Sequence, residues 1–309
     1  SGQLDPDPAL IDRLFQCTQC HDCARRCPSN AACPDIVLAA RREMVRRGMT
    51  TETQNVLIEN VQSTGNIYAD PAVEFPIREG EVPLFIGCQY LSRPNSVKKI
   101  VKFLDRIGIS PRIMEESCCG FPLHVMGFEQ ANQAQISAVR ERFQSGGDRV
   151  LTLCPSCMKQ LKEMYDQPSI HILELLDERL QDITVSSPLS KKVTYHDPCD
   201  LSRGAGITLE PRRILEHLGA LLVEMPHHGE TSRCCGGGGG ILTWDADLSL
   251  RMSISRVREA RETGAEMLVT ACPTCEQNLK RGAVAESEET GHPPLAVRHL
   301  LDLMIRATR

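Results

Sequence analysis

The chain has 309 residues, a formal net charge of −5 and an aromatic content of 4%. Such a chain has neither the basic field that holds a phosphate backbone nor the aromatic platforms that stack bases, so we expect no nucleic-acid partner. No apolar run approaches the roughly 18 residues that cross a bilayer, and no charged-then-apolar leader opens the sequence. We therefore expect a cytoplasmic protein with no transmembrane segment.

Cysteine is the most informative residue type in the chain, with 15 copies. An odd number of cysteines, many of them in Cys-x-x-Cys units of a long chain, differs from the disulfide framework of a small secreted domain. The pattern indicates metal binding in a reducing compartment.

The first segment, predicted to cover residues 1–66, is helix-rich, with one helix expected over 36–48. It contains a C-x₂-C-x₂-C-x₃-C-P run, which is typical of ferredoxin-like [4Fe-4S] binding. The run consists of Cys17, Cys20, Cys23 and Cys27. In two-cluster ferredoxins the fourth cysteine of such a run ligates the other cluster, and this chain has no second run. Either Cys27 closes the same cluster, or Cys33, which also precedes a proline, takes that place.

Two copies of a five-cysteine pattern follow, in domains predicted to cover residues 67–182 and 183–309. Each copy has one cysteine, then an adjacent pair, then Cys-Pro-x-Cys. The first copy is Cys88, Cys118, Cys119, Cys154 and Cys157, and the second is Cys199, Cys234, Cys235, Cys272 and Cys275. A zinc site takes four ligands, and adjacent cysteines cannot easily both reach one small ion. Five thiols per copy therefore favour an iron–sulfur assembly over a zinc ribbon.

The secondary structure predicted around these cysteines also repeats. A strand ends at the first cysteine of each copy, over 82–88 and 192–199; a helix, a second strand, a long amphipathic helix, a third strand and a terminal helix follow. In the first repeat, helices are expected over 96–107, 130–143 and 171–180, and the remaining strands over 111–114 and 149–153. In the second repeat, helices are expected over 211–218, 248–262 and 299–306, and the remaining strands over 220–224 and 266–270. This order predicts an α/β fold with two pseudo-symmetric repeats and small parallel sheets, preceded by the helical ferredoxin-like segment. The thiols should gather at the carboxyl ends of the strands.

Glycines follow each adjacent cysteine pair. Gly120, Gly236 and Gly237 are candidate cofactor-binding residues, because a missing side chain lets the backbone approach a bulky cluster and adopt positive φ. The run 236–240 could also suggest a phosphate loop, but it lacks the lysine and spacing of the known nucleotide motifs.

Two histidines are candidate catalytic acids that could protonate a leaving thiolate. His196 precedes the second set of cysteines, and His124 follows the first adjacent pair. The alternative for His196, which we slightly favour, is that it ends a strand and donates a hydrogen bond to nearby backbone. Arg93 and Arg203 could attract an anionic substrate or could be ordinary surface charges.

The paired cysteine motif resembles the duplicated cysteine-rich CCG domain of the B-type subunit of heterodisulfide reductase, over about three quarters of the chain. The N-terminal run is similar to one half of the C-type subunit, which carries two such runs. The resemblance implies a non-cubane [4Fe-4S] cluster on each five-cysteine set, beside a [4Fe-4S] cubane on the N-terminal run.

The same resemblance implies a function. The chain would be the iron–sulfur subunit of a heterodisulfide-reductase-like complex, taking electrons from flavoprotein and ferredoxin-like partner subunits and reducing a disulfide. The alternative is a non-catalytic electron-transfer subunit of a flavin dehydrogenase for glycolate, lactate or glycerol-3-phosphate that feeds quinone. A less favoured third interpretation is a scaffold whose clusters only shape an interface.

Overall fold

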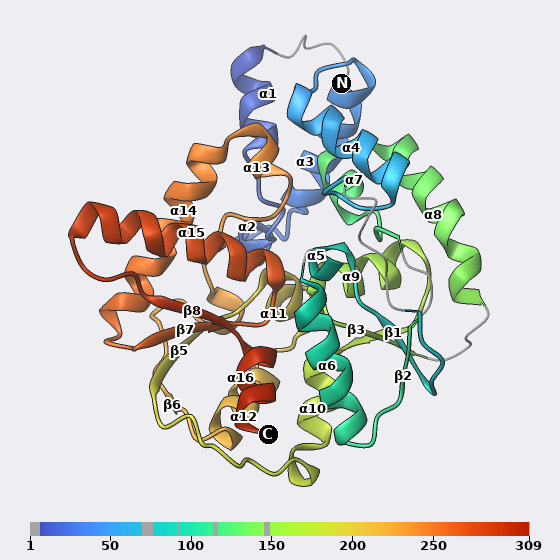
Figure 1. Cartoon of the computed structure of the whole chain (residues 1–309). Helices are drawn as coiled ribbons and strands as arrows, with labels where there is room; N and C mark the ends of the chain where they lie inside the picture. Colours follow the sequence, from blue (N-terminus) through green and yellow to red (C-terminus); the bar gives the residue numbers. More distant parts are fainter. Residues whose placement is uncertain (1–6, 70–76, 92, 114–116, 145–148, 309) are drawn as a thin grey trace.

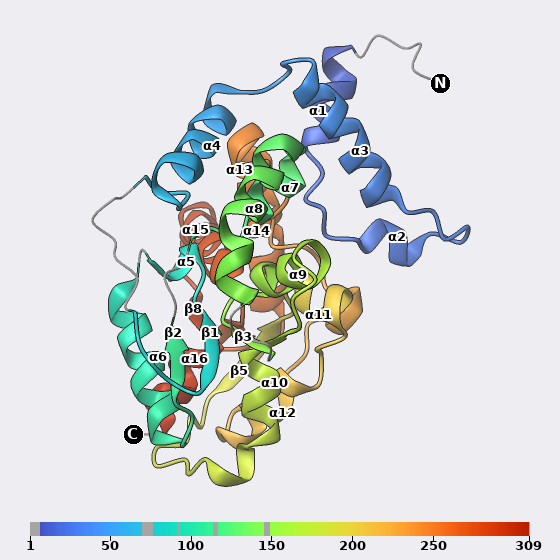
Figure 2. The same ribbon diagram turned by 90° about the vertical axis from the view of Figure 1, so that its right-hand side faces the viewer.

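Four helices form the N-terminal part of the computed structural model, which describes residues 7–69, 77–91, 93–113, 117–144 and 149–308. They are α1 (Pro8–Phe15), α2 (Asp22–Arg26), α3 (Cys33–Arg46) and α4 (Glu52–Thr64). Pro34 in the first turn of α3 lets this helix start before the expected residue 36. A capping box of Thr51 and Gln54 starts α4. Figures 1 and 2 show these helices gathered at one end of the molecule, above both sheets.

The first repeat contains a four-stranded parallel sheet with the order β2-β1-β3-β4. Its strands are β1 (Val82–Phe85), β2 (Pro111–Ile113), β3 (Val150–Thr152) and β4 (Ser169–His171). Its helices are α5 (Cys88–Leu91), α6 (Pro94–Arg106), α7 (Phe121–Met126), α8 (Glu129–Gln144), α9 (Pro155–Met164) and α10 (Ile172–Glu178), followed by the 3₁₀ turn η1 (Leu180–Asp182). Residue 114, the predicted end of the second strand, lies outside the described residues.

The second repeat has the same topology, with the parallel order β6-β5-β7-β8. Its strands are β5 (Lys192–His196), β6 (Leu221–Leu222), β7 (Met267–Thr270) and β8 (Ala296–His299). Its helices are α11 (Cys199–Ala205), α12 (Glu210–His217), α13 (Ile241–Trp244), α14 (Ala246–Glu262), α15 (Pro273–Thr290) and α16 (Leu300–Ala307), with the 3₁₀ turn η2 (Gly229–Thr231). The predicted α/β fold with two pseudo-symmetric repeats is confirmed. The domain boundaries themselves stay a prediction.

Each sheet has a fourth strand that the sequence analysis missed. β4 and β8 are three and four residues long and run directly into helices, so they carry too little alternation to be read from sequence. His171 and His299, expected as the first residues of helices, instead end these strands. Each imidazole Nδ1 then accepts a hydrogen bond from the helix that follows, from the backbone N–H of Leu173 and Leu301.

The two repeats share one hydrophobic core. α10 of the first repeat packs on α12 of the second, and α16 of the second packs on α6 of the first. α10 is the equivalent of α16, and α12 is the equivalent of α6. The same kind of helix pair therefore occurs twice, as in a two-fold symmetric dimer. Leu84 and Val193, from the central strands, belong to the same buried cluster. The carboxyl edges of both sheets therefore face a common region below the N-terminal helices (Figure 1). Within the described residues, no helix combines the length and apolar character needed to cross a bilayer.

Candidate metal centres

The first five-cysteine set is buried and continuous. Cys88 begins α5 and its Sγ lies 3.9 Å from that of Cys118. Cys119 is in side-chain contact with both Cys118 and Cys157, and Cys157 with Cys154. Three loops beyond the ends of β1, β2 and β3 thus bring five thiols into one chain of contacts, as the topology predicts.

The second set repeats this order of contacts. The Sγ atoms of Cys235 and Cys275 lie 3.2 Å apart. Cys234 contacts Cys199 and Cys235, and Cys275 contacts Cys272. The Cys-Pro-x-Cys units of both sets start α9 and α15, so the positive ends of these helices lie beside the sulfur atoms.

Thiols packed this closely cannot all ionise without a cation between them. A hydrogen bond with Cys118, and then burial, raise the pKa of Cys88 well above its usual value. Hydrogen bonds with Cys119 and Cys88 hold the pKa of Cys118 well below its usual value. Neighbouring thiols therefore share protons, and five thiolates require a multiply charged cationic partner. Soft thiolate donors in this number suit an iron–sulfur assembly.

The N-terminal cysteine run lies against the second set. A hydrogen bond with Cys234, and then burial, raise the pKa of Cys20. Arg203 on α11 donates from Nε to the Cys20 carbonyl at 2.6 Å, and Lys159 Nζ lies 3.2 Å from His21 Nε2. Nothing in the sequence pattern indicated which of the two sets the run would approach.

The structure brings Cys33 between two other thiols of the N-terminal segment. Burial, followed by the charges of Cys33 and Cys17, raises the pKa of Cys23. Cys27 interacts with Cys33 as well, but its nearest partner is the Ser29 hydroxyl, 3.1 Å from its Sγ. Both candidates for the fourth position are therefore in this group.

The two five-cysteine sets lie on either side of a shared wall. A cavity of about 160 Å³ is lined by thiols of the first set and by the glycine run 237–240 of the second repeat. A narrower space of about 30 Å³ is lined by all five thiols of the second set. The residues that line both are Phe121, Ser156, Gly238, Gly239 and Thr274.

The glycines predicted to bind a cofactor have different surroundings. Gly120 has a φ of 84°, and a Cβ there would lie 2.5 Å from Asn132 Oδ1. Gly236 has a φ of 78°, and a Cβ there would lie 2.7 Å from the Ser249 carbonyl oxygen. Gly237 lines the larger cavity. Among the described glycines, the one beside a cysteine sulfur is Gly87, where a Cβ would lie 2.9 Å from the Sγ of Cys157. Its position directly before the first cysteine was the only available signal.

The later glycines of the run admit other parts of the protein. A Cβ at Gly239 would lie 2.5 Å from the carbonyl carbon of Thr18, and one at Gly240 would lie 2.3 Å from Met126 Cγ. The run therefore provides space for the N-terminal loop and for α7, in addition to the cysteine sets.

Arg41 holds these parts together and was missed in the sequence. Its fully buried guanidinium donates to the carbonyl of Val125 at 2.6 Å, of Gly239 at 2.8 Å and of Leu14 at 2.9 Å. It also donates to the carbonyl of Cys17. Since these acceptors are distant in sequence, no local pattern could have identified the residue.

The two candidate histidines are placed differently. The imidazole of His196 is buried; its Nδ1 lies 3.1 Å from Arg256 Nε, and one ring nitrogen lies within 4.8 Å of the Sγ atoms of Cys235 and Cys275. His196 Nε2 has no hydrogen-bond partner among the described residues, so the favoured backbone hydrogen bond is not found. Burial, and then Arg256, lower its pKa to about 3.

His124 lies on α7 but is not among the residues that line the larger cavity. Burial, followed by the charges of Arg42 and Lys159, lowers its pKa to about 4. Its role as an acid at the first set stays a prediction without geometric support.

Both arginines considered as anion binders have structural partners. Arg93 donates to Glu276 at 2.5 Å, joining the first repeat to the second. Arg203 donates to the Ser232 carbonyl at 2.7 Å in addition to that of Cys20. These contacts favour a packing role over substrate attraction.

Comparison with protein-family models matches the CCG cysteine-rich domain to residues 82–162 and again to residues 193–280. The two matches cover more than half of the chain. The chain belongs to this family. The motif-based family prediction is thereby confirmed, and the duplication with it.

Relatives of this CCG protein include named redox proteins. It is 29% identical to the D-type subunit of the dihydromethanophenazine:CoB–CoM heterodisulfide reductase of Methanosarcina barkeri, over 96% of this chain and 78% of that one. It is 27% identical to EtfAB:quinone oxidoreductase of Syntrophomonas wolfei, over 90% of this chain but 45% of that one. The reductase relative is thus a D-type subunit, and the narrower assignment to the B-type subunit is not supported. A hypothetical protein from Helicobacter pylori shares the fold, with a TM-score of 0.55 and 10% identity over 82% of this chain and 53% of that one.

Proposed function

We propose that this CCG protein is an electron-transfer iron–sulfur subunit of a heterodisulfide-reductase-like complex. The observation that carries the proposal is the meeting of two five-thiol sets at one shared wall, the first buried and the second partly buried. The N-terminal run is in contact with the second set. Bound there, iron–sulfur clusters would accept and donate single electrons. The relatives named as heterodisulfide reductase and quinone oxidoreductase proteins support this class of chemistry.

Each group of thiols is assigned one cluster. The two five-cysteine sets would hold the non-cubane [4Fe-4S] clusters, and the N-terminal run would hold a cubane through Cys17, Cys20, Cys23 and one further thiol. Cys33 is the better fourth ligand, because its charge raises the pKa of Cys23, whereas the Cys27 thiol is hydrogen-bonded to the Ser29 hydroxyl. The contact between Cys20 and Cys234 makes the second set the entry point for electrons from the N-terminal cluster.

In a narrower form of the proposal, this chain itself reduces a disulfide, and the larger cavity is where the disulfide would bind. It is lined by Cys119 and by apolar side chains such as Phe121 and Met126. A disulfide bound there would receive two electrons from a partner flavoprotein by way of this chain. Its S–S bond would break, and each sulfur would take one electron and one proton to give a thiol.

The same cavity also supports the relay alternative. Among its described lining residues there is no histidine, carboxylate or lysine that could supply those protons. His196, lining neither space, has a pKa lowered to about 3 and carries no spare proton at neutral pH. A relay that passes electrons to a partner needs no such acid.

One anaerobic experiment separates the two. The protein is loaded with iron and sulfide, reduced chemically, freed of excess reductant and mixed with small disulfides, while cluster absorbance and released thiol are followed. Reoxidation with two thiols formed per two electrons supports disulfide reduction by this chain. Reduced clusters that persist with disulfide but are reoxidised by a quinone-linked partner support the relay. Failure to bind iron contradicts both.

A further inference from the structure

The second five-cysteine set has a polar neighbour that the first set lacks. We propose that His196 donates a hydrogen bond from Nε2 to a sulfur atom of the second cluster and thereby holds its reduction potential above that of the first. This inference rests on the proposed function in so far as the second set binds an iron–sulfur cluster. His196 is then a positioning and tuning residue, neither a ligand nor a catalytic acid.

The tautomer of His196 follows from its partner. Arginine can only donate, so the 3.1 Å contact from Arg256 Nε makes Nδ1 of the imidazole an acceptor. In a neutral ring the proton must then be on Nε2. A metal-ligating histidine shows the opposite arrangement, in which the second nitrogen donates to a carboxylate or carbonyl.

The Nε2 proton needs an acceptor, and the described residues do not provide one. His196 is 1% exposed, and its Nε2 has no partner among the described residues. A buried donor without a partner destabilises the fold, so a site built in this way indicates an acceptor outside the polypeptide. The Sγ atoms of Cys235 and Cys275 lie within 4.8 Å of one nitrogen of the ring. Cluster sulfide or thiolate sulfur at this place would accept the hydrogen bond.

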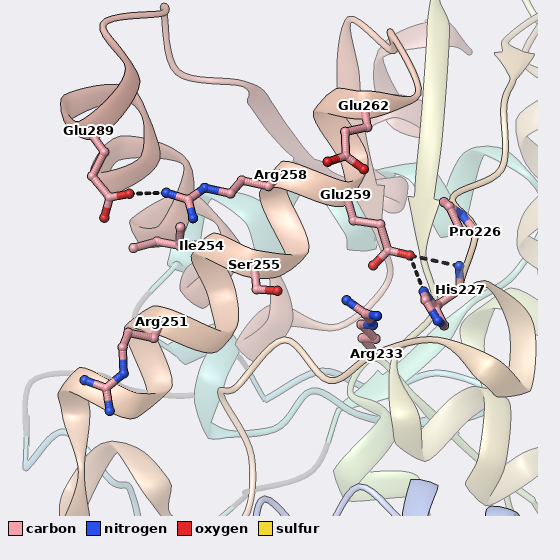
Figure 3. Close-up of a pocket in the computed structure, with 10 residues that line it drawn as sticks. All are labelled: Pro226, His227, Arg233, Arg251, Ile254, Ser255, Arg258, Glu259, Glu262 and Glu289. Carbon is pink, nitrogen blue, oxygen red and sulfur yellow. Dashed lines mark hydrogen bonds and ion pairs between the residues drawn. The ribbon is translucent and has the colours of Figure 1, made fainter.

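A fixed network prevents the ring from turning over. Arg256 donates from Nη1 to Glu259 at 2.7 Å and from Nη2 to the Ser232 hydroxyl at 3.1 Å. Glu259 also accepts from the backbone N–H of His227 at 2.8 Å. Figure 3 shows Glu259 bonded to His227 among the residues that line a surface pocket of about 570 Å³. The network thus connects His196, through Arg256 and Glu259, to a residue of this pocket.

The first repeat has apolar residues at the same two positions. Phe85 pairs with Thr152 in the sheet and His196 pairs with Thr270, and each threonine precedes its Cys-Pro-x-Cys unit by two residues. Phe85 and His196 are therefore equivalent. Phe85 packs in a cluster with Cys119, Cys154 and Cys157.

The partner of His196 is replaced as well. Gln160 and Asn278 are equivalent, because each lies three residues after the last cysteine of its set. Asn132 on α8 is hydrogen-bonded to Gln160, and Ser249 on α14 is hydrogen-bonded to Asn278, so Asn132 and Ser249 are equivalent too. Val139 lies seven residues after Asn132 on α8, and Arg256 lies seven residues after Ser249 on α14. The apolar pair Phe85–Val139 of the first repeat thus corresponds to the polar pair His196–Arg256 of the second.

This difference has a consequence for the order of electron transfer. A reduced cluster carries one more negative charge than an oxidised one, so a hydrogen bond to its sulfur stabilises the reduced form and raises the potential. An apolar environment without that donor leaves the first cluster harder to reduce. The second cluster, which contacts the N-terminal run, should therefore be reduced first.

The test uses the full chain loaded with iron and sulfide and labelled with ¹⁵N-histidine. In the partially reduced protein, pulsed electron paramagnetic resonance should show one weak ¹⁵N coupling together with an exchangeable proton, as expected for N–H···S. A strong coupling, typical of a directly bound nitrogen, would overturn the proposal, and so would the absence of any coupling. Because this measurement needs no substitution, it does not depend on the folding of a variant.

Variants give the size of the effect. His196→Phe should lower the reduced-to-oxidised ratio of the first-reduced cluster about tenfold at fixed potential, or about 59 mV for one electron. His196→Gln, which keeps an N–H donor, should recover most of this shift. The exposed His292 lies outside the candidate sites, and His292→Asn is the control that should change nothing. Equal potentials in the Phe, Gln and unsubstituted proteins would refute the tuning role. Clusters that form without the coupling refute this inference alone, whereas a protein that binds no iron refutes the proposed function too.

Discussion

The two repeats have the same sheet order and the same sequence of thiol contacts, but their surroundings differ. The first set lies beside Phe85 and an apolar cavity, whereas the second lies beside His196 and contacts Cys20 of the N-terminal run. Duplication has preserved the ligand geometry, which the strand ends impose. The residues one layer further out have diverged, and they can give two chemically similar centres different tasks.

The largest expected effect concerns the N-terminal run, in which Cys20 contacts Cys234 of the second set. Cys33→Ser should abolish the cubane signal of the loaded protein, because it removes the thiol whose charge acts on Cys23, while both five-cysteine sets keep their iron. The matched variant Cys27→Ser should retain all three centres. Iron analysis and electron paramagnetic resonance of the two variants check this, and the reverse outcome would make Cys27 the ligand.

Arg41 tests how the N-terminal segment is joined to both repeats. Arg41→Leu leaves buried carbonyls such as those of Val125 and Gly239 without a donor, and should lower the free energy of unfolding by about 3–5 kcal/mol. The neighbouring Arg42 makes only a loose contact of 3.7 Å with Glu129, so Arg42→Leu should cost about 0.5 kcal/mol or less. Urea unfolding compares them. Similar values for both variants would contradict a central role for Arg41.

The longer glycine run of the second repeat can be tested in the same way. Gly239 and Gly206 both have positive φ, but a Cβ at Gly239 meets Thr18 at 2.5 Å whereas one at Gly206 meets nothing within 4 Å. Gly206→Ala should cost about 1 kcal/mol of backbone strain, and Gly239→Ala should cost about 3 kcal/mol because the N-terminal loop must also move. Limited proteolysis should then cut residues near Thr18 sooner in Gly239→Ala. Equal losses of stability in the two variants would show that the N-terminal loop at Thr18 does not pack against Gly239.

The smallest expected effect concerns the backbone of the adjacent cysteine pair. The carbonyl of Cys119 accepts from the Tyr165 hydroxyl at 3.1 Å, whereas the equivalent carbonyl of Cys235 accepts from Asn278 at 2.7 Å. Tyr165→Phe should cost about 1 kcal/mol, and Asn278→Ala, which also breaks contacts with Ser249, about 2–3 kcal/mol. Thermal unfolding ranks the two. A greater loss in Tyr165→Phe would show that the first pair is held more tightly than the second.

The parts of the fold that depend on local pattern could be predicted from sequence. Short-range spacing predicted the strands before Cys88 and Cys199, although these strands end three residues earlier, at Phe85 and His196. It also predicted the proline-started helices that follow Cys154 and Cys272. The edge strand that ends at His171 could not be predicted, since three residues carry no periodicity.

The site could be predicted only as far as its ligands. Repeated spacing indicated which cysteines could gather as sulfur donors, but it could not show that Cys20 contacts Cys234, because that contact joins residues far apart in the chain. Arg41 and Arg256 were missed for the same reason: a buried arginine looks like a surface charge until its acceptors are known. His196 was found, but its adjacency to Cys199 suggested proton transfer, and only the direction of the Arg256 hydrogen bond points to a donor to sulfur.

Iron X-ray absorption of the anaerobically loaded protein tests the central claim most directly. We expect iron bound by sulfur with neighbouring iron atoms at a longer distance, and loss of part of that signal when either Cys119 or Cys235 is replaced by serine. Zinc bound by four isolated sulfur atoms, or iron with no iron neighbour, would contradict it.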